Sequence, residues 1–313
     1  MTEFVPVAQF REHYLYAPED GFISFFNSPY YSHTNMTGID IFPGNLAYSE
    51  AFSPVKGTVR EIRTFHGHSK LLNASELEYL ILIENKDEPT TYTKLLHVKP
   101  TVKKGDYIDI GDKIGEFIRS FFFARWTDPH MHAEFRPKED TMRARGAFQL
   151  HLCQRFQKES KYEEVPLKAK LIKYTPNALF LEINEDAFSK QKIAGLRVGI
   201  EKKKDDTLIT GIMDAGIPYF GHGGIFINDV SEIAPGDIVK VNGISIGQII
   251  EVNPAGKYVR FRPTSFHIRW KEIDFKGISC RLCLKDRFIK IITTPTNSFQ
   301  HQIGDFDIVK FIL

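Results

Sequence analysis

The sequence predicts a mainly β protein with two domains, and two observations support this prediction. Short β-like runs dominate the chain, and Gly, Pro, Asn or Asp bounds each of them. The chain has 313 residues, of which 42% are hydrophobic and 26% are charged. This length and balance are sufficient for two globular domains with separate hydrophobic cores.

The first half contains five strand-like runs, followed by a charged segment. The runs are GIDIFP, KGTVREIRTF, LEYLILIEN, DYIDI and MHAEF. The charged segment ends at Pro166, and a charged stretch that ends in proline is typical of a domain boundary. We therefore expect one β domain over residues 1–160 and a second over residues 161–313.

The second half contains ten further strand-like runs, which begin with ALFLEIN and end with FIKIITT. Many short strands separated by turn residues are typical of β-barrels and sandwiches. We expect a closed or nearly closed, barrel-like β domain here.

Composition limits the partners and the compartment. The chain has 41 basic and 39 acidic residues and a net charge of +2, so no strong field favours nucleic acid or an anionic membrane. We expect neither as a partner. The N-terminus lacks the basic start and apolar segment of a signal peptide, and three cysteines do not make a disulfide framework. These features predict a cytoplasmic protein.

The stretch TDPHMHAEFRP has the clearest chemical signal in the sequence. It alternates polar and apolar residues, so as a strand it directs His130 and His132 to one face and its apolar residues to a core. Two imidazoles at this spacing can both bind a metal ion, or one can bind while the other transfers protons. Taken alone, the pair also fits the solvated face of an ordinary strand.

Three segments, in this order and spacing, resemble the lysostaphin-type (LytM-like) zinc endopeptidases. The first segment is SHTNMTGIDIFP, followed by SPVKGTV, and it contains the family's Gly-x-Asp and Pro-x-x-Gly-x-Val motifs. The second segment is VKKGDYIDIGDKIG, which contains Val-x-x-Gly-Asp. The third segment is DPHMHAEFRP, which contains His-x-His. The resemblance covers about residues 30–137. It implies an antiparallel β-sandwich for the first domain and leaves the second domain without a relative.

The resemblance also implies a zinc site and assigns residues to it. Asp40 and His132 match two of the family's zinc ligands. His130 matches the residue that accepts the water proton or stabilises the intermediate, and His97 is its partner across the site. A catalytic zinc takes about three protein ligands and leaves a position for water, whose pKa it lowers towards neutrality. Zn²⁺ is therefore the expected cofactor.

The chain departs from the family pattern at the first ligand. The family has a histidine four residues before the aspartate, but Met36 occupies this position, and a thioether suits zinc poorly. His33 lies three residues earlier, and the Ser, Thr and Asn around it allow a turn that carries its imidazole to Asp40. We expect His33 to be the third ligand, and a broken site is the alternative. His97 also departs, because it is not in the family's Tyr-x-His-Leu motif.

Two functions remain open on the sequence. The leading hypothesis is a zinc-dependent metalloendopeptidase that cleaves a peptide-like substrate, for which the resemblance implies short glycine-containing peptides. The alternative is a catalytically inactive binding or scaffolding protein that keeps the fold, and Met36 motivates it. We expect Trp126, shortly before the His-x-His strand, to wall the substrate cleft. The sequence does not define the oligomeric state.

Overall fold

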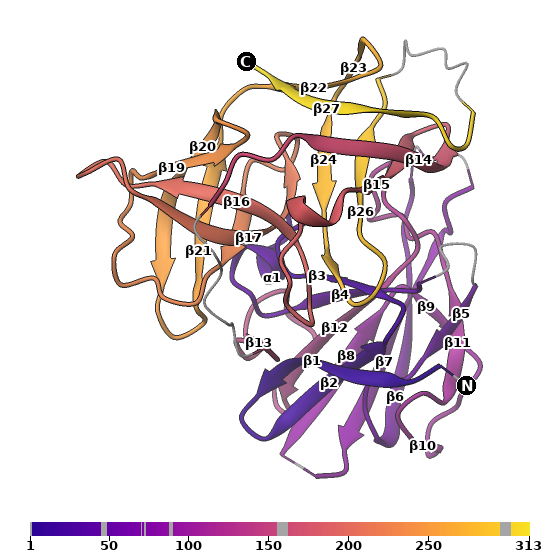
Figure 1. The fold of residues 1–313 in the computed structure, drawn as a ribbon. Helices are drawn as coiled ribbons and strands as arrows, with labels where there is room; N and C mark the ends of the chain where they lie inside the picture. The colour runs from indigo at the N-terminus through magenta and orange to yellow at the C-terminus, as the bar shows by residue number, and fades with distance from the viewer. Residues whose placement is uncertain are drawn as a thin grey trace. The chain divides into compact units, whose positions relative to one another are not determined.

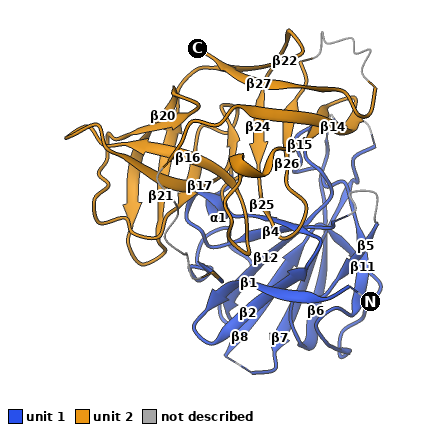
Figure 2. Cartoon of the chain, viewed as in Figure 1, with its two compact units in different colours: residues 1–25, 30–153 blue, residues 26–29, 154–313 orange. Residues whose placement is uncertain are grey.

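A computed structural model describes residues 2–44, 49–69, 71, 73–87, 90–154, 162–294 and 302–313. Almost all regular structure in these ranges is β-strand (Figure 1), so the mainly β prediction is confirmed. The chain forms two compact units, shown in Figure 2. Unit 1 consists of residues 1–25 and 30–153, and unit 2 consists of residues 26–29 and 154–313. The predicted boundary at residue 160 lies outside the described residues.

Unit 1 is built from antiparallel strands and one short helix, α1 (Tyr31–Thr34). Its strands are β1 (Phe4–Phe10), β2 (His13–Pro18), β3 (Phe22–Ser24), β4 (Ile39–Phe42), β5 (Glu50–Phe52), β6 (Gly57–His66), β7 (Leu77–Asn85), β8 (Thr91–Leu96), β9 (Val98–Pro100), β10 (Tyr107–Ile108), β11 (Lys113–Phe117), β12 (Met131–Pro137) and β13 (His151–Leu152). They pair in the orders β13-β1-β2, β10-β6-β7-β8-β12-β4-β3 and β5-β11-β9.

Strand β12 lies between β4 and β8 and brings the candidate site into the interior of unit 1. Its register places His132 opposite Asp40 of β4 and opposite Leu96 of β8. The apolar face of β12 is buried, as its alternation predicts. Its polar face, formed by His132, Glu134 and Arg136, is buried too, as is His130 directly before the strand. A solvated strand face is therefore excluded as the explanation of the His-x-His pair.

Unit 2 contains one 3₁₀ turn, η1 (Glu185–Ala187), and a continuous series of strands. The strands are β14 (Leu167–Thr175), β15 (Ala178–Ile183), β16 (Leu196–Glu201), β17 (Leu208–Ile217), β18 (Gly223–Phe226), β19 (Ile238–Val241), β20 (Ile244–Asn253), β21 (Tyr258–Pro263), β22 (His267–Trp270), β23 (Ile273–Phe275), β24 (Gly277–Cys280), β25 (Leu282–Cys283), β26 (Phe288–Ile292) and β27 (Phe306–Ile312).

Part of unit 2 closes on itself. Strand β16 pairs with both β17 and β19, which closes the series β16-β19-β20-β21-β18-β17 into a six-stranded barrel. The predicted barrel-like architecture of the C-terminal half is thus confirmed. Within the described ranges, no helix has the length and apolar character needed to cross a membrane.

Candidate metal centre

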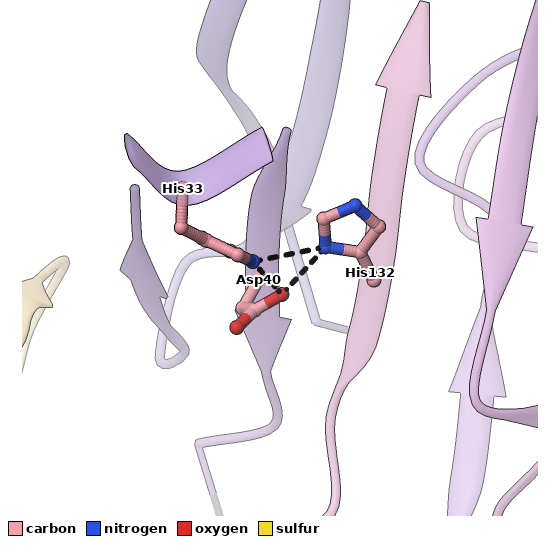
Figure 3. A group of neighbouring side chains, drawn as sticks. All are labelled: His33, Asp40 and His132. Atoms are coloured by element: carbon pink, nitrogen blue, oxygen red, sulfur yellow. Dashed lines mark hydrogen bonds and ion pairs between the residues drawn. The ribbon is translucent and has the colours of Figure 1, made fainter. Parts of the chain in front are cut away.

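Three buried side chains of unit 1 each direct one donor atom to a common point (Figure 3). Nε2 of His33 lies 3.2 Å from Nδ1 of His132 and 3.2 Å from Oδ1 of Asp40. Nδ1 of His132 lies 2.8 Å from the same Oδ1. Ligands at about 2.0–2.1 Å from a tetrahedral zinc are about 3.3 Å apart, so one metal ion could be held between these atoms with small adjustments.

Helix α1 and the turn after it bring His33 to this point. The helix begins after Tyr30, whose carbonyl accepts a hydrogen bond from the backbone N–H of His33 at 3.0 Å. The chain then reverses at Met36, which has a left-handed φ of 52°, and the N–H of Thr37 bonds back to the carbonyl of Ser32 at 2.9 Å. The turn therefore carries the chain into β4 while His33 stays above that strand.

Gly38 allows the ring of His132 to lie close to the backbone that precedes β4. A Cβ atom at this position would be 2.5 Å from Cε1 and 2.7 Å from Nε2 of His132. Carbon and nitrogen atoms do not approach this closely without a bond, so a larger residue would displace the ring. The glycine of the Gly-x-Asp motif thus has a direct steric role at the site.

In His33 and His132, the ring nitrogen that points away from the donor cluster, here called the outer nitrogen, lies within hydrogen-bond distance of an acceptor. Nδ1 of His33 lies 2.9 Å from the carbonyl oxygen of Phe25, and Nε2 of His132 lies 3.1 Å from Oε1 of Glu134. Carbonyl and ionised carboxylate oxygens only accept, so both outer nitrogens donate and the inner nitrogens point lone pairs at each other. Together with the carboxylate of Asp40, these lone pairs require a cation between them, either a proton or a metal ion.

Glu134 is held ionised by two buried cations. Its Oε2 lies 3.3 Å from Nζ of Lys94 and 3.2 Å from Nη1 of Arg136. Burial alone would raise the pKa of Glu134, but the hydrogen bond from His132 and these cations lower it to about 2. The carboxylate therefore remains available to accept the proton of His132.

The pKa values of the candidate ligands His132 and Asp40 are shifted in opposite directions. Burial alone would lower the pKa of His132, but its hydrogen bonds to Asp40 and Glu134 outweigh burial and raise this pKa to about 9. Burial would raise the pKa of Asp40, yet the neighbouring imidazoles of His130, His33 and His132 hold it well below its usual range. In the absence of a metal, a proton on His132 thus balances the charge of Asp40.

His130 lies beside the donor cluster with its Nε2 facing inwards. Its Nδ1 donates to the carbonyl of Asp128 at 2.8 Å, and its Nε2 is 3.4 Å from Oδ2 of Asp40. The ring stacks on Phe123 at 4.6 Å between centroids. Burial lowers the pKa of His130 to about 4 although Asp40 opposes this shift. The ring is neutral at pH 7, and its Nε2 can accept a proton.

His97 is anchored by a carboxylate instead of a backbone carbonyl. Its Nδ1 and its backbone N–H each lie 2.8 Å from an oxygen of Glu78, and the hydroxyl of Ser120 also donates to Glu78. The ring centroid is 5.2 Å from that of His130. The carboxylate of Glu78 thus fixes the orientation of the His97 ring, whereas a backbone carbonyl fixes that of His130.

The structure brings five of the predicted site residues into one group: His33, Asp40, His97, His130 and His132. The sixth, Trp126, is half-buried four residues before His130, and its role in substrate binding stays a prediction. Glu78 and Glu134 were not predicted. The only signal for Glu78 is an acidic residue near the start of the apolar run LEYLILIEN.

Comparisons with known proteins assign no activity to the chain. A family model described as "Domain of unknown function (DUF8155) N-terminal domain" matches residues 15–152, which is less than half of the chain. No curated protein matches the sequence. The NMR solution structure of lysostaphin is similar with 14% identity and a TM-score of 0.24, covering 72% of this chain and 80% of that chain. A TM-score this low supports no conclusion about fold or function.

Proposed function

We propose that the protein is a zinc-dependent hydrolase that cleaves a peptide bond. The observation that supports this best is the convergence of His33, Asp40 and His132, whose inner donor atoms are 2.8–3.2 Å apart. Two imidazoles and one carboxylate are a ligand set typical of catalytic zinc, which keeps a further position for water. The approach of His33 to the other two donors supports it as the third ligand in place of Met36.

Bound Zn²⁺ would supply a Lewis acid and a water molecule of lowered pKa. The protein supplies the proton transfers. His130, neutral and held by Asp128, accepts the proton of the attacking water at its Nε2 as the oxygen bonds to the substrate carbonyl carbon. The same proton then passes to the amide nitrogen as the carbon–nitrogen bond breaks.

His97 is suited to a different task in the same reaction. Glu78 accepts the Nδ1–H of His97 and so fixes the orientation of its ring beside His130. We assign His97 to the stabilisation of the negative charge that develops on the carbonyl oxygen. The two histidines thus differ in the acceptor at Nδ1, which is a carboxylate for His97 and a backbone carbonyl for His130.

Metal content and peptide cleavage, measured on the same variants, test this function. We expect wild-type protein to bind one equivalent of zinc and to cleave members of a mixed peptide pool detected by mass spectrometry. His33→Ala should lose zinc, whereas Met36→Leu should keep it. His130→Ala should keep zinc and lose cleavage by roughly 100-fold or more, the usual contribution of an acid–base residue.

His66→Ala is the matched control, because His66 is an exposed histidine at the end of β6 and should leave both readouts unchanged. Wild-type protein without zinc, or a His33→Ala variant that binds zinc as wild type does, would contradict the proposed metal site. Zinc bound without any cleavage would favour the alternative of an inactive binding protein.

A further inference from the structure

Exposed aromatic side chains gather beside the candidate metal centre. The large hydrophobic side chains that are most exposed among the described residues of unit 1 are Tyr30, Tyr31, Tyr107, Phe122 and Met142. Tyr30 and Tyr31 lie three and two residues before His33 in the chain, and the ring centroid of Phe122 lies 6.4 Å from that of His97. Single exposed apolar residues are ordinary, but several next to a candidate active site indicate contact with a ligand.

Tyr30 and Phe122 form a defined pair. Their ring centroids are 6.2 Å apart with an interplanar angle of 84°, and the hydroxyl of Tyr30 donates to the carbonyl of Phe122 at 2.8 Å. The pair links the start of α1 to the segment that contacts His97. Tyr30 is 49% exposed and Phe122 is 46% exposed, so both residues are accessible to a ligand.

The chemistry of the pair selects an apolar group. The hydroxyl of Tyr30 already donates its proton within the protein, and Phe122 has no polar side-chain atom, so the pair has no side-chain donor left and offers mainly ring surface and edges. A sugar ring would also need hydrogen-bonding partners for its hydroxyl groups, and leaving these unpaired is unfavourable. An aromatic or large aliphatic side chain needs only the apolar contact.

We propose that Tyr30 and Phe122 form a subsite that binds an aromatic or large aliphatic side chain of the peptide substrate, close to the bond that is cleaved. This inference rests on the proposed peptidase function. It differs from the substrates that the family resemblance implies, because glycine has no side chain to fill such a subsite. Phe122 is thus a specificity-determining residue, positioned by its contact with Tyr30.

Peptide binding by the full-length, chelator-treated protein tests the subsite without any need for metal or cleavage. The probes are capped tetraglycine and a capped tetrapeptide with one phenylalanine among three glycines, titrated calorimetrically. We expect the phenylalanine peptide to bind roughly tenfold or more tightly than tetraglycine, because its side chain removes apolar surface from water at the pair. Phe122→Ala should lose this preference, and Phe122→Leu should keep part of it.

Tyr107→Ala is the matched control, since Tyr107 is a similarly exposed aromatic residue on β10, and it should keep the full preference. The thermal unfolding midpoint of each variant verifies folding. Equal or undetectable binding of the two peptides to the wild type, or an unchanged preference in Phe122→Ala, would overturn the subsite. Absence of zinc or cleavage, with the preference intact, would overturn only the hydrolase function.

Discussion

At the scale of single residues, the hydrogen bond on the outer side of each imidazole decides which atom can bind a metal ion. Phe25 and Glu134 occupy the outer nitrogens of His33 and His132, which leaves Nε2 of one ring and Nδ1 of the other facing Asp40. The two acceptors differ, because a carboxylate also increases the basicity of the ring that it holds. Glu134 should therefore affect metal affinity more than a neutral acceptor would.

Replacement of Glu134 by glutamine tests this role. Glu134→Gln keeps the shape and an acceptor oxygen but removes the charge that supports His132 and balances Lys94 and Arg136. We expect zinc affinity to fall roughly 10- to 100-fold. The free energy of unfolding should fall by about 3 kcal/mol, because buried Lys94 loses its counter-charge and Arg136 is left with Asp140 as its ion-pair partner. Competition with a chromophoric chelator and urea unfolding measure the two effects.

Glu84→Gln is the control for this variant. Glu84 pairs with Arg60 and Lys138, whose side chains are 48% and 38% exposed, so solvent screens both interactions. The loss of stability should be at most about 1 kcal/mol, with no change in zinc affinity. Unchanged zinc affinity in Glu134→Gln would show that its charge has no role at the site.

Sequence spacing singled out Asp40, His132 and the strand that carries Glu134, but it could not identify the acceptors at His97 and His33. The Gly-x-Asp and His-x-His motifs are local, whereas Glu78 meets His97 across 19 positions of the chain and Phe25 meets His33 through a backbone carbonyl. A backbone carbonyl leaves no trace in residue type. The sequence also did not show that the polar face of β12 is buried. Alternation predicts which side chains share a face of the strand, but not whether other parts of the protein cover that face.

At the scale of elements, the pairing of β4 with β12 places Asp40 directly opposite His132. A shift of one residue would send one of the two side chains to the other face of the sheet. The sequence predicted both strands, but not their pairing, and it did not predict α1, whose four residues are too few for a periodic pattern. The helix matters because it supplies His33 from outside the sheet.

Gly38→Ala tests the close packing between the start of β4 and His132. The added Cβ would lie 2.5 Å from Cε1 of the ring, so the ring must move away from its inner position. We expect zinc affinity to fall roughly 10- to 100-fold, as when the support of a metal ligand is lost. The circular dichroism spectrum should retain its β character, because the change displaces one side chain and leaves the strand pairing intact.

Gly105→Ala provides the contrast for this variant. Gly105 has a φ of 97°, and a Cβ atom added there would have no neighbour within 4 Å, so alanine strains the backbone without a steric clash. Stability should fall by about 1 kcal/mol while zinc affinity stays at the wild-type value. If Gly38→Ala binds zinc as tightly as the wild type, the ring of His132 does not depend on this contact.

At the scale of the whole molecule, metal binding and folding stability should both depend on the proton of His132. The pKa of this histidine is raised to about 9 in the metal-free protein because its carboxylate partners outweigh burial. A raised pKa stabilises the folded state fully below the unfolded value of about 6.5, and this stabilisation is lost as the pH rises through 9. Zinc needs the neutral ring, so it competes with the same proton.

We therefore expect the apparent zinc affinity to rise about tenfold per pH unit from pH 7 to pH 9 and to level off above that range. Zinc binding should release about one proton at pH 7 and about half a proton at pH 9, measured by calorimetry in buffers of different ionisation enthalpy. His130 adds nothing in this range, because burial lowers its pKa to about 4. A zinc affinity that does not change between pH 7 and pH 9 would mean that no proton occupies the site, and the three donors would then need another cation to hold them together in the metal-free protein.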